Sequence, residues 1–177
     1  MRRCALVLWM GLTACRTAAP AFEGDFGQLE IDEAERASGP ALRLELRLLP
    51  VAGEPSRRRR AAPPIELTLL AQPARSDDAE VVIKTRGESV RYGECQELAT
   101  LADGGRAPLA QARHEVQTEP SGSVTEELRS AAGFEAVRTL AAAAEVGVSV
   151  CQDTFRASSG QRQTLQRFFK EWSARRR

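Results

Sequence analysis

Residues 41–48 alternate apolar and charged side chains without interruption, in the order Ala-Leu-Arg-Leu-Glu-Leu-Arg-Leu. Successive side chains of a strand point to opposite faces, so the leucines at positions 42, 44, 46 and 48 would share one face. In a helix the same leucines would spread around the cylinder and form no single stripe. The run therefore predicts a half-buried strand that needs a sheet to pair with and a core to cover one face.

Further short apolar runs bounded by turn residues predict more strands. They lie at residues 26–31, 65–69, 80–84, 89–92, 96–101 and 108–117. Asp103-Gly104-Gly105 predicts the turn of a hairpin between the last two runs. Residues 123–130 suit either an edge strand or a helix with a capping box from Ser123 to Glu126, and we favour the strand. Strand signals at this spacing predict an antiparallel sheet or a sandwich-like sheet.

The end of the chain changes to helical spacing. Apolar residues over 134–144 recur at the period of a helix, and alanines from 141 to 144 add high helix propensity. Gly147 is predicted to stop this helix. A hairpin follows, with one strand over 146–150 and a second over 154–157.

A second helix is predicted after that hairpin. Ser158 and Gln161 have the spacing of a capping box, which marks a helix start. The helix that follows carries one apolar stripe, made of Leu165, Phe168, Phe169 and Trp172. We interpret the stripe as core packing and expect an α+β fold: an antiparallel or sandwich-like sheet with two C-terminal helices packed on it.

This helix–hairpin–helix ending resembles a pattern in uncharacterised secreted bacterial proteins. In that pattern a helix with a leading Phe precedes a valine-rich hairpin, a Ser and a closing Leu-rich helix. The matching positions here are Phe134 to Ala141, Val148 to Phe155, Ser158 and Leu165. The resemblance implies a fold for this part of the chain and carries no chemistry with it.

The N-terminus has the composition of an export leader. Arg2 and Arg3 precede an apolar segment of 11 residues, from Cys4 to Ala14. Eleven helical residues rise about 16 Å, roughly half of a bilayer core, so the segment is too short for a permanent span.

Leu12-Thr13-Ala14-Cys15 resembles the lipobox of bacterial lipoproteins. The resemblance implies that the leader is cut before Cys15, that the Cys15 thiol receives a diacylglycerol, and that the new amine is acylated. The alternative is an ordinary secretory signal cut near Ala14 or Ala18. In lipoproteins of Gram-negative bacteria an aspartate after the cysteine commonly signals retention in the inner membrane. Arg16 stands there, so the resemblance favours the outer membrane, facing the periplasm.

The leader divides the chain into three expected parts. Residues 1–14 are the lipoprotein signal peptide, 15–24 the lipidated cysteine with a short tether, and 25–177 a single globular α+β domain. The full chain has 25 basic and 24 acidic residues, so removing Arg2 and Arg3 leaves 23 against 24. A near-neutral domain has no general attraction for nucleic acid, so we expect no nucleic-acid partner.

Four cysteines fit the same compartment. Cys4 would leave with the leader and Cys15 would carry lipid, so Cys95 and Cys151 remain as a pair. In an oxidising compartment two such cysteines most simply form a disulfide. Two buried, unpaired thiols and a reactive or metal-binding pair are the alternatives.

No catalytic motif stands out in the sequence. His114 is the single histidine, and we interpret it as a polar position on a strand. One histidine and two distant cysteines do not readily supply a zinc site, and we expect neither a metal nor another cofactor. Glu126 and Glu127 are adjacent, so they would point to opposite faces of a strand. A pair of acids distant in the sequence stays possible.

Four consecutive arginines, Arg57, Arg58, Arg59 and Arg60, lie in a loop bracketed by prolines. In a lipid-tethered protein they could contact anionic lipid, with about 1 kcal/mol for each basic residue near the surface. The alternative is a solvated loop kept extended by like charges.

The sequence therefore predicts a lipid-anchored protein of the bacterial cell envelope. Its expected role is non-catalytic: binding, scaffolding or assembly support that offers a sheet face or edge to an envelope protein or glycan. The alternative is a hydrolase of envelope glycan or peptide that uses carboxylates not identified in the sequence. A third hypothesis is a surface sensor whose arginine loop docks on anionic lipid.

Overall fold

The computed structural model describes residues 27–32, 41–51 and 62–176. The predicted signal peptide, Cys15, the tether and Arg57 to Arg60 lie outside the described residues. None of the described helices is both long and apolar enough to cross a membrane.

Ten strands and two helices make up the described part of the chain. In order they are β1 (Gln28–Asp32), β2 (Ala41–Pro50), β3 (Ile65–Ala71), β4 (Asp78–Gly87), β5 (Leu98–Ala102), β6 (Gly105–Pro108), β7 (Arg113–Thr118), β8 (Val124–Gly133), α1 (Phe134–Ala142), β9 (Val146–Val150), β10 (Asp153–Arg156) and α2 (Ser159–Arg175).

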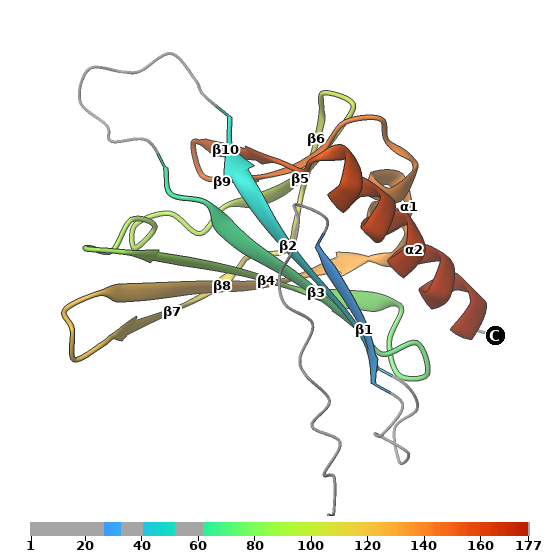
Figure 1. Cartoon of the computed structure of the whole chain (residues 1–177), viewed down its shortest axis with the longest axis horizontal. Coiled ribbons are helices and arrows are strands. Elements are labelled where there is room, and N and C mark those ends of the chain that lie inside the picture. The colour runs from blue at the N-terminus through green and yellow to red at the C-terminus, as the bar shows by residue number, and fades with distance from the viewer. Residues whose placement is uncertain (1–26, 33–40, 52–61, 177) are drawn as a thin grey trace, which may run out of the picture.

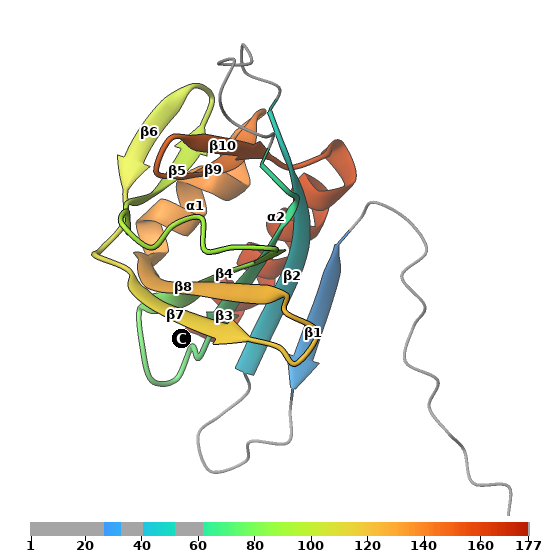
Figure 2. The same ribbon diagram turned by 90° about the vertical axis from the view of Figure 1, so that its left-hand side faces the viewer.

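All neighbouring strands pair antiparallel, in the order β6-β5-β9-β10-β2-β3-β4-β8-β7. One edge of β2 serves two partners, because its first residues pair with β1 and Leu49 and Pro50 pair with β10. The first and last strands of this order, β6 and β7, are neighbours in the chain. The sheet therefore curls back on itself, and both helices pack on its concave side (Figures 1 and 2). The predicted α+β class is confirmed.

The alternation of β2 sets the buried face of the sheet. The alternating leucines at positions 42, 44, 46 and 48 are at most 2% exposed, whereas the charged residues between them are half-buried or exposed. Cross-strand register continues this face from Leu46 to Leu67, Ile83 and Leu128. The partner of Leu128 on β7 is His114, so the row of apolar side chains ends at the histidine.

Helix α2 is fixed at its start by the predicted capping box. The backbone N–H of Gln161 donates to Oγ of Ser158, and the N–H of Ser158 donates to Oε1 of Gln161. The side-chain amide of Gln161 also donates to the carbonyl of Arg47, 2.6 Å away, and so joins the helix to β2. Phe168 and Trp172 on the apolar stripe are fully buried.

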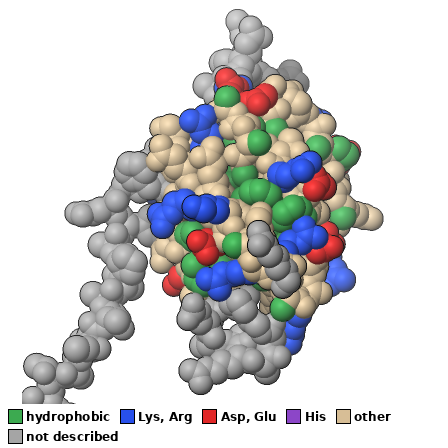
Figure 3. Space-filling model, turned by 90° about the vertical axis from the view of Figure 1, so that its right-hand side faces the viewer, with side chains coloured by type: hydrophobic (Ala, Val, Ile, Leu, Met, Phe, Trp, Pro, Cys, Tyr) green, Lys and Arg blue, Asp and Glu red, His purple; other side chains and the backbone are tan. Residues whose placement is uncertain are grey.

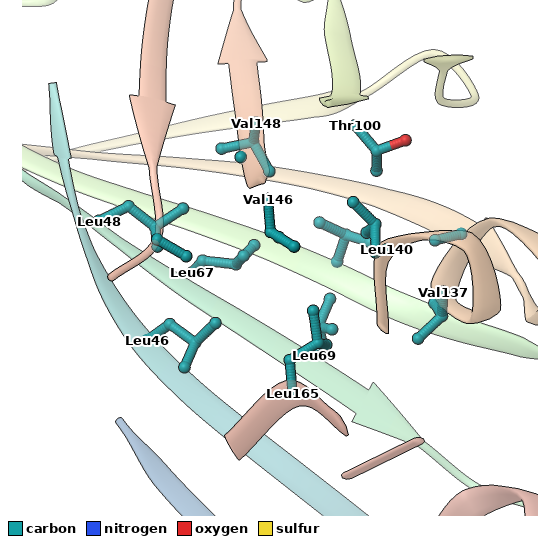
Figure 4. A pocket seen from close by; sticks show the side chains of 14 residues that line it. Leu46, Leu48, Leu67, Leu69, Thr100, Val137, Leu140, Val146, Val148 and Leu165 are labelled. Atoms are coloured by element: carbon teal, nitrogen blue, oxygen red, sulfur yellow. The ribbon is translucent and has the colours of Figure 1, made fainter. Parts of the chain in front are cut away.

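The space between the helices and the sheet is filled. Figure 4 shows leucines and valines from β2, β3, β9, α1 and α2 converging on one region of the core. The cavity that remains among them is about 20 Å³, the room of about one water molecule, and its walls are almost entirely apolar. Such a space stays dry and offers no site for a larger ligand.

Two local predictions are wrong. Residues 89–92 do not form a strand but belong to the connection between β4 and β5, since a distant side chain accepts their backbone N–H groups. Helix α1 ends at Ala142, before Gly147, because the Asp103 carboxylate accepts the N–H groups of Ala144 and Glu145 at 2.8 Å each.

Gly147 lies within β9, where the absence of a side chain allows β10 to approach closely. A Cβ at this position would stand 2.3 Å from the carbonyl oxygen of Phe155 on β10, which is closer than real side chains approach. The prediction of a strand over 123–130 is confirmed. The hairpin turn at Asp103 and Gly104 is present, with φ of 48° and 80°, but the prediction for the strand after it is also wrong. That strand is β6, whereas most of the predicted run 108–117 lies in β7 and pairs with β8.

Candidate functional site

Glu126 is a carboxylate on the buried face of β8. The strand alternates buried and half-buried side chains, and Glu126 lies between Val124 and Leu128 on the buried side. Its exposure is 2%, within the range of 0–5% found for the core leucines. A buried carboxylate is costly unless several donors compensate for the lost water, so its partners explain why it is there.

Two backbone N–H groups and one imidazole nitrogen surround the Glu126 carboxylate. The backbone N–H of Arg91 donates to Oε2 at 2.8 Å, and the backbone N–H of Tyr92 donates to Oε1 at 2.9 Å. Nε2 of His114 lies 3.1 Å from Oε1, with its side chain only 8% exposed. Glu126 therefore holds the β4–β5 connection and β7 against the same end of β8.

A second carboxylate binds the side chains of the same two residues. Nε of Arg91 and the hydroxyl of Tyr92 each donate to Oδ2 of Asp153 at 2.9 Å. Burial raises the pKa of Tyr92, and the nearby Asp153 charge raises it further. The hydrogen bond to Asp153 also raises the pKa of Arg91, so the ion pair stays charged.

The Cys95–Cys151 disulfide fixes the other end of this connection. The two Cα atoms are 6.0 Å apart, and the bond joins the segment before β5 to the turn between β9 and β10. Nearby backbone bonds support it, from Cys95 N–H to the Tyr92 carbonyl and from Cys151 N–H to the Glu97 carbonyl. The predicted disulfide is therefore present in the structure.

Together these contacts define the strap, residues 88–97, which crosses the open side of the curled sheet. Figure 2 shows it in green between β8 on one side and the β5, β9 and β10 strands on the other. Hydrogen bonds join the strap to Glu126 on β8 and to Asp153 on β10. The disulfide joins it covalently to Cys151, directly after β9. The hydrogen-bonding groups of the site thus connect the two sides of the curled sheet through the strap.

An open groove lies beside the strap. Residues 94–98 and 108–111 line it together with Arg106, and its volume is about 850 Å³. The side chains of Arg106 and Glu97, both largely exposed, approach to 3.7 Å across it. The buried carboxylate of Glu126 is not among the residues that line this groove.

The structure confirms some of the predicted site residues and reveals others that the sequence did not indicate. Cys95 and Cys151 come together as predicted, and Glu126 and Glu127 do occupy opposite faces of a strand. His114 lies on a strand, but its contact with Glu126 was not predicted. Arg91, Tyr92 and Asp153 were missed altogether, as was the proximity of the acids Glu126 and Asp153 to a common segment. The alternation of Val124 and Leu128 around Glu126 was the one local signal for a buried acid.

Comparison with known proteins finds no matching family model, no similar curated protein and no similar solved structure. The two resemblances drawn from the sequence, at residues 12–15 and over the C-terminal helix–hairpin–helix, therefore stay predictions.

Proposed function

We propose that the protein is a lipid-anchored component of a bacterial cell envelope with a non-catalytic binding, scaffolding or assembly-support role. The lipid is attached at Cys15, and the domain faces the periplasm from the outer membrane. Its partner is an envelope protein or glycan.

The disulfide is the main observation that supports a location in an oxidising compartment. Disulfides persist in oxidising compartments such as the periplasm and are rare in the cytosol. The pairing of Cys95 with Cys151 leaves Cys15 available for lipid once Cys4 has left with the leader. This agreement between two independent features supports export of the chain.

The binding role is supported by how the acids of the site are used. Both oxygens of Glu126 accept backbone N–H groups, and Asp153 accepts from Arg91 and Tyr92. Because these carboxylates stabilise the strap, we assign the partner to an exposed face or edge of the sheet. On the face that carries α2, basic, acidic and apolar side chains are interspersed (Figure 3).

Mass spectrometry and cross-linking test the proposal together. Protein purified from membranes is expected to start at Cys15 and to carry acyl mass, and cross-linking in intact envelopes is expected to capture a defined partner. A mature N-terminus elsewhere would remove the anchor. A correctly anchored protein that captures no partner and turns over an envelope substrate would contradict the binding role.

One contact favours the alternative of an envelope hydrolase. His114 and Glu126 form an imidazole–carboxylate pair, the kind of pair that transfers protons in acid–base catalysis. His114→Ala and Glu126→Gln, each checked for native folding, would abolish hydrolysis of envelope glycan or peptide if the pair were catalytic. Turnover that is unchanged in both variants would exclude these residues from catalysis.

A further inference from the structure

Strand β7 forms a free edge of the curled sheet. It pairs with β8 on one side, and within the described part of the chain no strand pairs with its other side. Every residue of β7 except His114 is exposed, and the apolar Val116 is 44% exposed. Unpaired backbone N–H and carbonyl groups along such an edge can accept another strand.

The charges of β7 do not complement those of β8. In the register of the two strands, Arg113 stands directly opposite Arg129, and Glu115 stands directly opposite Glu127. Like charges at directly opposed positions destabilise a strand pair. The sequence of β7 is therefore not optimised for the one strand that it contacts.

The charges of Arg129 and Glu127 on β8 are already paired with side chains of β4 and with each other. Arg129 pairs with Glu80 at 3.0 Å and also with Glu127, which in turn lies 3.5 Å from Lys84. Among the described residues, no ion-pair partner is found for Arg113 or Glu115. Both charges are exposed and available to a group on the free side of β7.

The other two edge strands differ from β7. Strand β6 is four residues long and ends at Pro108, which lacks a backbone donor. Strand β1 contacts α2, whose residues Gly160 and Thr164 lie beside Leu29. Strand β7 has six residues with neither proline nor glycine. It is therefore the edge best suited to pairing with a further strand.

We propose that the free edge of β7 binds an extended segment of a partner protein as an added antiparallel strand. The segment places an acidic side chain opposite Arg113 and a basic one opposite Glu115, two positions apart. Backbone hydrogen bonds supply the affinity and these two charge pairs select the sequence. Antiparallel addition continues the pairing found throughout the sheet. This inference rests on the proposed binding role and identifies its surface.

Two peptides of identical composition test the edge. In Thr-Thr-Val-Lys-Val-Glu-Thr, antiparallel pairing sets Lys opposite Glu115 and Glu opposite Arg113. In Thr-Thr-Val-Glu-Val-Lys-Thr, the same pairing opposes like charges. The mature domain is expected to bind the first peptide about tenfold more tightly, as followed by changes in backbone amide NMR signals. The preference should weaken as salt is raised.

A double charge exchange, Arg113→Glu with Glu115→Arg, supplies the matched protein. This variant is expected to prefer the second peptide by a similar factor. It should also resist urea at least as well as the parent. The exchange places a glutamate directly opposite Arg129 and an arginine directly opposite Glu127, so both cross-strand pairs become attractive. A reversed preference in a variant of full stability cannot come from misfolding.

Several outcomes would overturn the proposed edge. They are equal binding of the two peptides, tighter binding of the second by the parent protein, no binding of either at about 1 mM, and self-association through β7 with neither peptide bound. If envelope cross-linking captures the same partner with parent and double variant, the binding role stands and β7 is not its surface.

Discussion

Glu126 shows how one residue can decide the position of a whole segment. Its carboxylate is buried, and the N–H groups of Arg91 and Tyr92 both donate to it. Glu126→Ala should leave both donors buried without a partner, at a cost of about 1–3 kcal/mol for each. We expect a loss of about 3 kcal/mol or more in the free energy of unfolding, measured by urea denaturation.

Glu127 provides the control for that substitution. It is the next residue of the same strand but faces the outer side, where it pairs with Lys84 and Arg129. The Glu127 side chain is 17% exposed. A glutamine in its place keeps the side-chain shape and an acceptor for Lys84 and Arg129, so Glu127→Gln should lower stability clearly less than Glu126→Ala does. Equal losses from both variants would mean that strand β8 tolerates no change, and that the contacts of Glu126 are not the cause.

Tyr92 allows a direct spectroscopic test, because it is the single tyrosine of the chain. Burial and the Asp153 charge raise its pKa above the ordinary value of about 10. Tyrosinate absorbance should therefore appear at higher pH in the folded protein than in urea. A group with a raised folded pKa stabilises fully below the unfolded pKa, so its contribution is lost as pH rises above about 10. Coincident titrations in the two states would contradict the buried contact with Asp153.

Residue-scale contacts were the least predictable part of the site. Tyr92 and Glu126 are 34 positions apart and Arg91 and Asp153 are 62 apart, so no local pattern relates them. The alternation around Glu126 predicted its face, but whether that face is buried depends on the strap. The cysteine pair was predictable because oxidation chemistry restricts the partners of a cysteine far more than those of an acid.

At the scale of elements, periodicity was a reliable guide where it was long. The eight-residue alternation of β2 and the capping box of α2 both appear in the structure. Residues 89–92 have strand-like composition over only four positions, and there the carboxylates of Glu126 and Asp153 outweighed local propensity. Gly147 was interpreted as a helix stop, whereas close approach of β10 requires it.

The strap can be released at its disulfide end without touching its acid contacts. Cys95→Ala with Cys151→Ala removes a cross-link across 56 positions, for which chain entropy gives about 4 kcal/mol. We expect the urea midpoint to fall by a corresponding amount, with native-state amide exchange increasing first in residues 93–97. Because Glu126 still binds the Arg91 and Tyr92 amides, these two should remain protected. Loss of protection at both would show that the disulfide alone holds the strap.

At the scale of the whole molecule, the sequence predicted the class of fold but not its curvature. β2 pairs with β1 along its first half and with β10 at its end, and a short connection joins β6 to β7 at the two ends of the strand order, so no local pattern encodes the curl. It brings β5, β9 and β10 opposite β8 and gives the strap two sides to join. The same topology leaves β7 as an edge.

The relation of the molecule to a membrane can be tested through the arginine loop. Replacing Arg57 to Arg60 with glutamine removes four positive charges between β2 and β3. At about 1 kcal/mol for each charge near an anionic surface, binding of the unlipidated domain to phosphatidylserine vesicles should fall by up to about a thousandfold. Vesicle sedimentation at low and high salt measures this, and zwitterionic vesicles should bind neither protein.

A matched control removes four exposed positive charges elsewhere on the domain: Arg75, Arg138, Arg167 and Lys170. If the loop contacts lipid, this control should lower vesicle binding far less than the loop variant does, although both have the same net charge. Equal losses would mean that only net charge matters, and salt-insensitive binding would exclude an electrostatic contact. In either case the arginines would be a solvated loop, and the proposed lipid at Cys15 would be the remaining attachment to a membrane.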